Sequence, residues 1–320
     1  MFAPLLSLLN SLALPIPARL PIPHTVTVIV VAFLLDMGLG EFPRQIHPVV
    51  LFGRMIGHFD RSWSRPDLVG IPLAIGAPLF AAGVVAWITT LAFRFELLAG
   101  TVIAGILLFS TISLRSLLAV ATDVIALADA DLRQARTEVR ALVGRDAETL
   151  SPGEIRSATV ESAAENLADG LVGPLLAFAI VSHLSIPGGV AAAAFVKATN
   201  TLDSMLGYRT KPVGRASAKL DDLVMWIPAR VTAWVLAIVA LDPGAIRRAR
   251  TWAGEPSSPN SGWPMATMAA IGDVRLAKPG AYVLNPTADL PTTGCARSCV
   301  RIVGVAGVGA FLLSGVIAWV

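Results

Sequence analysis

Six runs of apolar residues alternate with polar segments along the chain. The runs lie at about 25–35, 71–93, 97–117, 171–196, 223–241 and 302–320. Three of them, 71–93, 97–117 and 302–320, approach the roughly 20 residues that a helix needs to cross a bilayer. The pattern therefore predicts an all-α, polytopic integral membrane protein with large polar helical and loop segments.

Two of the apolar runs are interrupted. The run 171–196 contains "IPGG" at 186–189, and each half is too short to span a bilayer. This break predicts a re-entrant segment or a kinked hairpin. The run 223–241 contains Pro228 and Arg230, which a plain lipid-facing helix would avoid. We therefore expect neither run to cross the membrane simply.

The polar segments between the runs differ in character. Residues 118–160 predict one long helix that continues out of the bilayer. A helix start is predicted at Ser151, because Pro152 follows it and Glu154 stands at the third helical position, as in a capping box. Residues 242–301 are rich in proline and glycine and predict mostly loop. No internal repeat divides the chain, so we expect one membrane-embedded domain over residues 1–320.

Composition supports the membrane assignment. The chain is 55% hydrophobic and 15% charged, with a mean hydropathy of +0.70, whereas soluble domains carry about 25% charged residues. The formal net charge is only +3, and no basic patch interleaved with aromatic residues is present. Nucleic acid is therefore excluded as a partner, and a multi-pass protein of the cell (inner) membrane is expected.

One stretch places three acids at the mouth of an apolar run. In "VESAAENLADGLVGPLLAFAIV", residues 160–181, the side chains of Glu161, Glu165 and Asp169 share one stripe of a helix. Like charges at this spacing repel by roughly 0.2–0.5 kcal/mol per pair. The stripe therefore predicts a positive partner, either a metal ion, a basic side chain or an amine. The alternative is a solvated helix face.

Four further polar clusters stand beside apolar runs. The segment 34–56 holds two acids, a histidine before a proline and an arginine, and the segment 197–211 spaces its polar residues by three to four. The segment 214–231 has two adjacent acids about 100° apart on a helix, so that one can bind while the other orients. The segment 257–276 has an aromatic residue on a rigid turn. The polar residues of the four clusters are Asp36, Glu41, His47 and Arg54; Lys197, Asn200, Asp203, Ser204, Tyr208 and Arg209; Lys219, Asp221, Asp222 and Arg230; and Asn260 and Trp263.

Each cluster also has a structural reading. Asp36 is a typical helix-end charge, His47 a typical turn residue, and a lone Trp263 is usually a packing residue. Arg230 lies inside an apolar run and requires a carboxylate partner. Common nucleotide, zinc-protease and serine-hydrolase motifs are missing. The chain has only four histidines, so its many carboxylates favour a hard cation such as Mg²⁺ over a histidine-rich metal site.

Taken in order, the five clusters resemble one family. The segments that carry the resemblance are "LLDMGLGEFPRQIHPVVLFGRMI", "VGRDAETLSPGEIRSATVESAAENLADG", "KATNTLDSMLGYRTK", "SAKLDDLVMWIPARV" and "SPNSGWPMATMAAIGDVRL". They are similar to the CbiB/CobD family, the membrane-bound adenosylcobinamide-phosphate synthases of cobalamin biosynthesis, over about residues 33–283. The chain departs from the family pattern at Met225, where an asparagine is usual, and at Met265, where a glutamate is usual.

The resemblance implies a reaction. The f propionate of adenosylcobyric acid is expected to be amidated by (R)-1-amino-2-propanol or its O-phosphate, giving adenosylcobinamide or its phosphate. The implied cofactors are ATP, which activates the carboxylate, and Mg²⁺. The implied partners are the corrinoid, the amine, the lipid bilayer and other cobamide-assembly enzymes of the membrane. The expected enzyme is thus an ATP-dependent amide ligase.

The resemblance and the chemistry of amide formation assign roles to the clustered residues. A base is needed to keep the amine neutral, and His47 is the first choice because its ordinary pKa is near 6.5, with Glu165 second. The expected catalytic residues are His47, Glu165, Asp169 and Asp203. The expected substrate-binding residues are Arg54, Asn166, Lys197, Asn200, Arg209, Lys219, Arg230, Asn260 and Trp263. The expected metal ligands are Asp36, Glu41, Glu161, Asp221 and Asp222. The aromatic residues expected to contact the corrinoid are Trp63, Tyr208, Trp226 and Trp263.

A transporter of ions or a small metabolite is the alternative function. An intramembrane Arg230, a broken apolar run and acids at its mouth all occur in transporters. The large polar segments at 118–170 and 242–301, which carry the motifs, favour an enzyme. Since one active site must gather them, we expect the segments 36–70, 118–170, 197–222 and 242–301 to share the cytoplasmic side.

Overall fold

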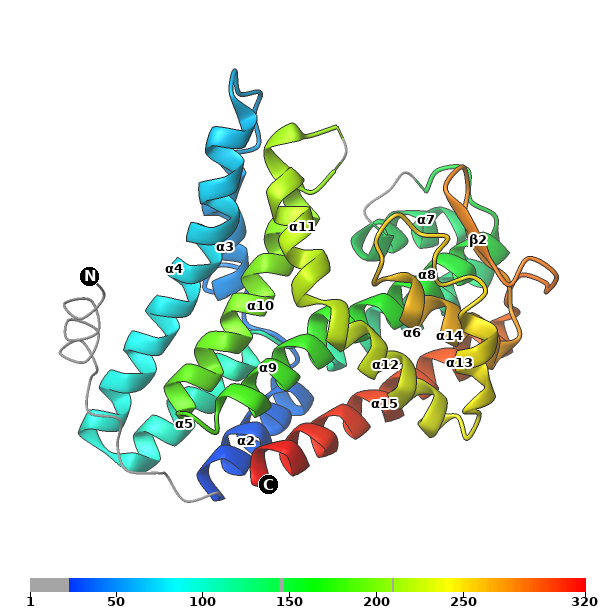
Figure 1. The fold of residues 1–320 in the computed structure, drawn as a ribbon. Helices are drawn as coiled ribbons and strands as arrows, with labels where there is room; N and C mark the ends of the chain where they lie inside the picture. The colour runs from blue at the N-terminus through cyan, green and yellow to red at the C-terminus, as the bar shows by residue number, and fades with distance from the viewer. Residues whose placement is uncertain (1–22, 144–146, 209) are drawn as a thin grey trace.

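The fold is a bundle of long helices with one short β-hairpin at its edge (Figure 1). The computed structural model describes residues 23–143, 147–208 and 210–320. The predicted substrate-binding residue Arg209 lies outside these residues. Figure 1 shows the bundle on one side and, beside it, a lobe that contains α7, α13, α14 and the hairpin.

Three helices of the described residues are long and apolar enough to cross a membrane. They are α4 (Pro66–Phe95), the continuous rod formed by α8 (Pro152–Leu167), η1 (Ala168–Val172) and α9 (Gly173–Val181), and α15 (Thr293–Trp319). The predicted span 71–93 falls inside α4, and the predicted span 302–320 coincides with α15 up to Trp319. The predicted all-α, polytopic membrane fold is therefore confirmed.

The run 97–117 does not form the predicted span. Helix α5 (Leu97–Phe109) ends after 13 residues, about 20 Å of helix at 1.5 Å per residue. The hydroxyl groups of Ser110 and Thr111 donate to the backbone carbonyls of Leu107 and Leu108, both at 2.7 Å, where the helix stops. Helix α5 instead packs against α2 (Pro23–Leu39) so closely that a side chain at Gly105 would meet Val31.

The run 171–196 forms the predicted hairpin, but the expectation that each half is too short to span is wrong for the first half, because α9 continues α8 in one 30-residue apolar rod. The chain turns at residues 182–185 between α9 and α10 (Ile186–Leu206). Gly189 lies against Phe178 and Ser182, where a β-carbon would come within 3.1 Å of side-chain or backbone atoms. Helix α9 extends α8, and α10 runs on to Leu206 after the chain reverses direction between α9 and α10.

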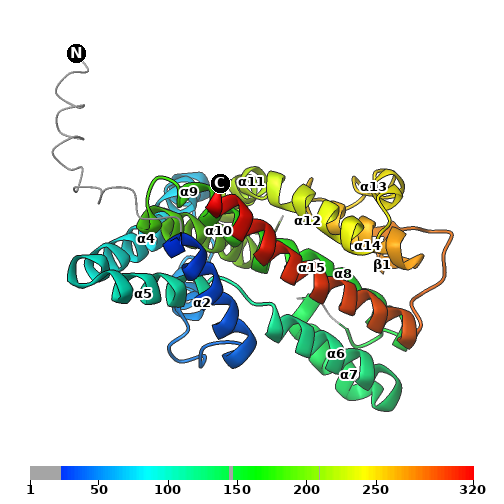
Figure 2. The ribbon, with the colours of Figure 1, turned by 90° about the horizontal axis from the view of Figure 1, so that it is seen from below.

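The single long helix predicted over 118–160 is wrong. Helix α6 (Arg115–Ala130) ends at Asp131, and α7 (Leu132–Val143) folds back beside it (Figure 2). The carboxylate of Asp131 accepts a hydrogen bond from the backbone N–H of Gln134 at 3.0 Å, which starts the second helix. The predicted start at Ser151 is confirmed, with both hydrogen bonds of its capping box to Glu154.

The segment 242–301 has more structure than the predicted loop. It contains α13 (Gly244–Ala249), α14 (Gly262–Gly272), the strands β1 (Leu276–Lys278) and β2 (Tyr282–Leu284), and the first turns of α15. Before it, η2 (Pro212–Gly214) and α11 (Arg215–Val224) lead into α12 (Trp226–Val239). The η2–α11 segment and α12 meet at 47° at Met225, so the run 223–241 forms a bent element rather than a straight span. The remaining helix is α3 (Pro48–Gly57).

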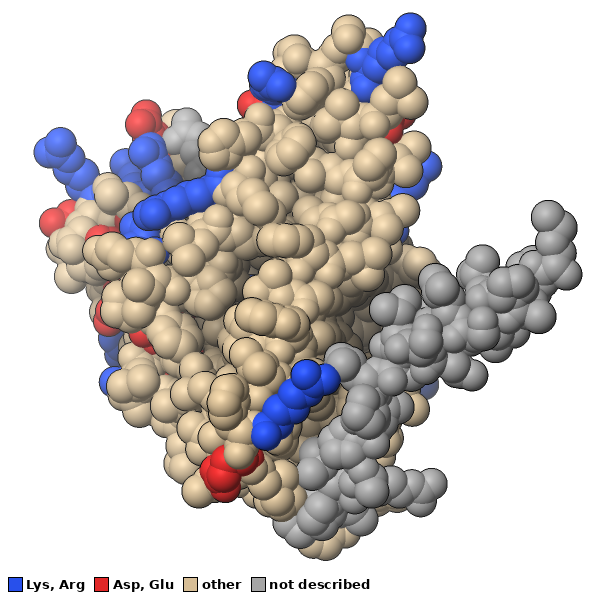
Figure 3. Space-filling view, turned by 90° about the vertical axis from the view of Figure 1, so that its left-hand side faces the viewer, with Lys and Arg blue, Asp and Glu red and all other residues tan. Residues whose placement is uncertain are grey.

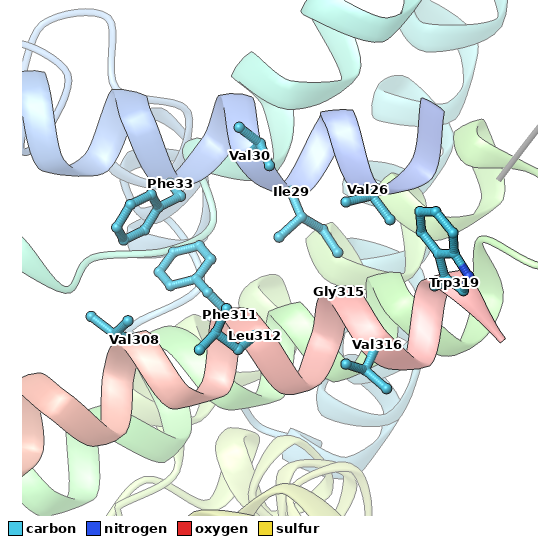
Figure 4. A pocket seen from close by; sticks show the side chains of 10 residues that line it. All are labelled: Val26, Ile29, Val30, Phe33, Val308, Phe311, Leu312, Gly315, Val316 and Trp319. Atoms are coloured by element: carbon cyan, nitrogen blue, oxygen red, sulfur yellow. The ribbon is translucent and has the colours of Figure 1, made fainter. Parts of the chain in front are cut away.

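A broad apolar surface shows where the bilayer lies. Figure 3 shows it as an almost uncharged face, with basic side chains at its upper end and a few charged side chains at its lower edge. Helix α4 contributes exposed side chains along its length, including Ile71 at 53% and Trp87 at 67% exposure. A groove of about 410 Å³ between α2 and α15 is lined only by apolar residues and glycine (Figure 4). These surfaces suit lipid chains and not solvent.

The connections between the helices bear on the expected shared side of the motif-bearing segments. In Figure 1 the α4–α5 connection, the α9–α10 turn and the C-terminus lie along the bottom, whereas the tip between α3 and α4 and the start of α11 lie at the top. We expect cysteines placed at Thr210 and Ser257, both exposed, to be protected from a membrane-impermeant thiol reagent in intact cells. Both native cysteines would first be replaced by serine.

A cysteine at Leu184, which is 77% exposed in the α9–α10 turn, is the matched control. It should react from outside, because it lies at the opposite end of the hairpin. Different reactivity at positions 210 and 257 would contradict a shared face, and protection at all three positions would contradict a spanning hairpin.

Candidate active site

The acid stripe lies where the α8–α9 rod changes from α-helix to π-helix. Pro174 has no N–H group, so the backbone carbonyl of Gly170 has no donor four residues on. It accepts a hydrogen bond from the backbone N–H of Ser113 instead, at 3.0 Å. The five residues Ala168–Val172 form the π-turn, in which Asp169 projects from the rod. Single π-turns inside α-helices often mark functional sites.

Residues from three helices meet around Asp169. Its carboxylate interacts with the amide of Asn200 and with the charges of Lys197 and Asp203, all on α10. Asp221 on α11 interacts with Asp169, Asp203 and the same amide. The structure therefore brings together the acid stripe, the "KATNTLD" segment and the adjacent acid pair, which are separate in sequence.

The two adjacent acids have different surroundings. Asp221 is 8% exposed, and its Oδ1 atom has no hydrogen-bond partner among the described residues. Asp222 is half-buried; its Oδ1 accepts from the Ser258 hydroxyl at 3.0 Å, and its backbone carbonyl accepts from the Asn260 side chain at 2.7 Å. A buried carboxylate oxygen without a donor is costly. Asp221 is thus the member of the pair that is open to a ligand, and Asp222 holds the 257–263 turn.

Among the described residues, Arg230 does not have the carboxylate partner expected from the sequence. The Arg230 guanidinium donates to the Asn260 side chain and to the backbone carbonyl of Trp226, both at 2.8 Å. It also lies over the rings of Trp226 at 4.3 Å and Trp263 at 5.4 Å. Cation–π and hydrogen-bond contacts replace an ion pair here. Arg230, Asn260 and Trp263 therefore join α12 to the turn before α14, on the side of Asp222.

The β-hairpin adds two residues that the sequence analysis missed. Tyr282 donates to Oε1 of the buried Glu161 at 2.8 Å, and the backbone N–H of Ala277 donates to the Ser157 hydroxyl at 2.9 Å. Lys278 is the cross-strand partner of Tyr282, so both side chains face the same way. The Lys278 charge acts on Glu165, one turn along α8. The turn residues in "LAKPGAYVL" were the sequence signal for this hairpin.

The two departures from the family pattern are both buried beside this cluster. Met225 packs with Ala168 and Val196, and a side chain at Gly173 would meet its terminal atoms at 3.2 Å. The sulfur of Met265 lies 3.8 Å from the Tyr282 hydroxyl. Two apolar side chains therefore fill positions at which the resemblance implies an amide and a carboxylate.

The first cluster is engaged mainly in holding helices together. The fully buried Asp36 accepts hydrogen bonds from the backbone N–H groups of Leu114 and Arg115 at 3.0 and 3.1 Å, so it caps the start of α6. Glu41 accepts from the hydroxyls of Ser113 and Ser116. These contacts occupy both oxygens of Asp36 and one of Glu41. The geometry therefore argues against Asp36 as a metal ligand.

The expectation that His47 is the base also conflicts with its hydrogen bond. His47 is the N-cap of α3, and its Nδ1 accepts from the backbone N–H of Val49 at 3.2 Å. A backbone N–H only donates, so neutral His47 carries its proton on Nε2 and has no free nitrogen lone pair. Burial lowers the pKa of His47, and the charge of Lys197 lowers it further against the opposing effect of Glu41. His47 lies beside the cluster as a neutral cap.

This cap predicts a pH-dependent stability. Because the pKa of His47 is lower in the folded protein than its ordinary 6.5, the unfolded chain takes up the proton first as the pH falls. The contribution of neutral His47 to the stability of the fold is therefore complete above about pH 6.5 and is lost as the pH falls below it. His47→Ala should cost about 1 kcal/mol near neutral pH, as loss of a cap does. His47→Asn, which keeps a capping oxygen, should lose less stability on acidification than wild type in thermal melts in detergent. Equal pH dependence of the two would contradict the assignment.

Several predicted residues lie away from the acid cluster or are engaged elsewhere. Arg54 and Lys219 are exposed on α3 and α11. The Asn166 amide donates to the backbone carbonyl and hydroxyl of Ser162 on its own helix. Trp63 and Tyr208 are next to a separate cavity beyond the end of α10, where Trp63 donates to the Phe59 carbonyl and Lys211 lies over the Tyr208 ring. Neither aromatic residue is near Arg230 and its two tryptophans.

The predicted magnesium site can be tested against these contacts. No group of three or more histidine, cysteine or acidic side chains in the described parts of the chain has the arrangement of a metal site. Magnesium, however, is usually held by one or two carboxylates together with substrate phosphates. Asp221, with its buried unpartnered oxygen, and the neighbouring Asp169 suit such a two-carboxylate site. The residues present therefore fit Mg²⁺ only if phosphate oxygens complete its coordination.

Comparison with known proteins identifies the family. A profile described as "CobD/Cbib protein" matches residues 29–303. The chain is 34% identical over 305 residues to "Probable cobalamin biosynthesis protein CobD" of Methanothrix thermoacetophila, covering 91% of this chain and 96% of that protein. It is 36% identical over 272 residues to "Cobalamin biosynthesis protein CobD" of Pelobacter propionicus, covering 80% and 81%. No solved structure matches. The chain therefore belongs to the CobD/CbiB family of cobalamin biosynthesis proteins.

Proposed function

We propose that this protein joins the f propionate of adenosylcobyric acid to (R)-1-amino-2-propanol or its O-phosphate through an amide bond. The observation that carries the proposal is the convergence of Asp169, Asn200 and Asp221, from three separate motifs, on one buried acidic site. Family membership supplies cobalamin biosynthesis as the context and does not favour the transporter alternative. The cell inner membrane is the proposed location.

The proposed reaction needs an activated carboxylate, because an oxide ion is a poor leaving group. In this scheme the propionate takes the terminal phosphoryl group of ATP and ADP leaves. The amine nitrogen then attacks the acyl carbon, and inorganic phosphate leaves with its electron pair. Negative charge gathers on the phosphates, which Mg²⁺ and basic side chains would offset. Asp221 and Asp169 are the proposed carboxylates for Mg²⁺.

Four further residues of the chain have proposed roles in binding and proton transfer. Lys197 interacts with Asp169 and lies on the same helix face as Asn200, so it is placed to bind a phosphate or the propionate. Lys278, whose charge acts on Glu165, is the second such cation. Glu165 lies between Asp169, Glu161 and Lys278, and we assign it, in place of His47, as the base that takes the ammonium proton. Asp203 completes the acidic site beside Asp221.

The test is a reaction with purified protein in detergent. Adenosylcobyric acid, Mg²⁺, ATP and either the free or the phosphorylated amine are combined, and the corrinoid is followed by mass spectrometry. The expected result is an amide product formed with one of the amines, dependent on ATP and matched by ADP release. Absence of any amide product with either amine, together with corrinoid movement across proteoliposomes, would support the transporter instead.

A further inference from the structure

Two hollows of opposite character adjoin at the tip where α3 leads into α4. One is a polar cavity of about 270 Å³, formed where residues 60–66 meet residues 210–213. The other is an apolar groove of about 550 Å³ between α3 and α4. Neither hollow contains a residue of the acidic site described above. Figure 3 shows basic side chains at this end of the molecule, above the broad apolar face.

The polar cavity carries a positive charge that no carboxylate of the described residues compensates. Its charged lining residues are Asp60, Arg61 and Lys211. Lys211 pairs with Asp60 at 2.7 Å, whereas Arg61 lies over the ring of Trp63 at 4.1 Å and pairs with no carboxylate of the described residues. One net positive charge therefore remains in the lining. A guanidinium stacked on an aromatic ring keeps its N–H edges available for an anion.

The first turn of α4 borders the cavity, and its one acidic residue, the exposed Asp67, does not line it. Pro66 lines the cavity and begins a helix of 30 residues. The N-cap residue, Arg65, makes no side-chain capping hydrogen bond, so it supplies no acceptor to the first N–H groups of the helix. Free N–H groups and the helix dipole favour an anion at such an end. The cavity thus combines Arg61, Lys211 and a helix start around one space.

The apolar groove begins where the polar cavity ends. Phe59 lines the groove, Trp63 lines the cavity, and their rings stack with centroids 6.4 Å apart. The groove follows α4 from Leu68 to Phe80 and has no charged residue in its lining. Twelve residues of helix measure about 18 Å, which matches an extended acyl chain. The groove between α2 and α15 likewise has no charged residue in its lining (Figure 4).

We propose that this composite site binds one anionic phospholipid. The headgroup phosphate lies against Arg61 and Lys211, and one acyl chain lies along the groove between α3 and α4. A membrane-spanning chain with a cationic cavity at the end of an apolar groove matches the charge and shape of such a lipid. Because Lys211 also donates to the backbone carbonyl of Met205 near the end of α10, the bound lipid would fix the α10–α11 connection. The inference does not depend on the proposed reaction.

The experiment measures lipid retention by native mass spectrometry of the purified full chain. The protein is exchanged into detergent that contains either phosphatidylglycerol or phosphatidylcholine, and glycerol 3-phosphate serves as the soluble headgroup alone. Two variants address the two parts of the site. Arg61→Gln removes the unpaired charge. Gly76→Leu fills the groove, since Gly76 lines it and a β-carbon there has nothing within 4 Å.

Gly83→Leu is the matched control for the groove variant. Gly83 is on the same helix, has the same open surroundings and does not line the groove. We expect wild type and Gly83→Leu to retain phosphatidylglycerol in preference to phosphatidylcholine, and Arg61→Gln and Gly76→Leu to lose at least about tenfold in retention, equivalent to roughly 1.4 kcal/mol.

Three results would overturn the proposal. Equal retention of the two lipids by wild type would show ordinary annular lipid. Equal losses in Gly76→Leu and Gly83→Leu would show that the groove is not the binding place. Competition by glycerol 3-phosphate, with no effect of Gly76→Leu, would show a site for a free phosphate. Melting temperatures of all variants separate these results from misfolding, and an unfolded Arg61→Gln leaves the glycine pair as the deciding comparison.

Discussion

Glu165→Gln and Asp169→Asn should each lower amide formation at least tenfold, about 1.4 kcal/mol in the activation barrier. Both substitutions keep the size of the side chain and remove its charge, so the helix packing should survive. Glu165 would lose its ability to take the ammonium proton. Asp169 would lose its charge toward Lys197 and the proposed Mg²⁺, although its replacement can still accept a hydrogen bond. Initial rates with saturating corrinoid and amine measure the effect.

Asp123→Asn is a suitable control, because Asp123 is an exposed acid on α6 outside the cluster. It should keep the wild-type rate. Melting temperature and elution volume in detergent would establish that each variant is folded. Wild-type rates in both Glu165→Gln and Asp169→Asn would mean that the acid stripe has no part in the reaction. A rate loss in Glu165→Gln alone would support Glu165 as the base and contradict Asp169 as a ligand in the proposed metal site.

The sequence predicted most of the membrane fold, because its signals are local. Span length, the capping box at Ser151 and the "IPGG" break each depend on residues adjacent in the chain. The errors arose where long-range contacts decide the structure. Helix α6 starts at Arg115 because Asp36, 78 residues earlier, binds the N–H group of Leu114. No periodicity in the run 97–117 contains that contact, so an apolar stretch was read as one span.

In the candidate site, too, local sequence signals were predictive and long-range contacts were not. The motifs located Asp169, Asn200 and Asp221, which do meet. Their spacing could not separate a carboxylate that caps a helix, such as Asp36, from one left open, such as Asp221. The difference lies in hydrogen bonds from distant backbone groups. Lys278 was not predicted as a site residue, because the sequence of a short β-hairpin in a segment rich in proline and glycine resembles that of a loop.

The adjacent acids Asp221 and Asp222 provide the sharpest test of the proposed metal site. From the sequence alone, both residues are expected metal ligands. The structure distinguishes them, because the Ser258 hydroxyl binds Asp222 while one oxygen of Asp221 is buried without a donor among the described residues. Asp221→Asn should therefore raise the Mg²⁺ concentration for half-maximal rate by about tenfold, near 1.4 kcal/mol of binding, and excess Mg²⁺ should partly restore activity.

Asp222→Asn serves as the comparison, since its amide oxygen can still accept from Ser258 and its backbone carbonyl from Asn260. It should keep the wild-type dependence on Mg²⁺, even if its rate or melting temperature falls. Titrating Mg²⁺ at fixed ATP and corrinoid gives both curves. Two unchanged curves at measurable activity would remove the pair from the metal site. A shift in Asp222→Asn alone would mean that the Ser258 contact opens when substrate binds. The comparison is informative because the two residues are neighbours in sequence, carry the same charge and differ chiefly in the donors that surround them.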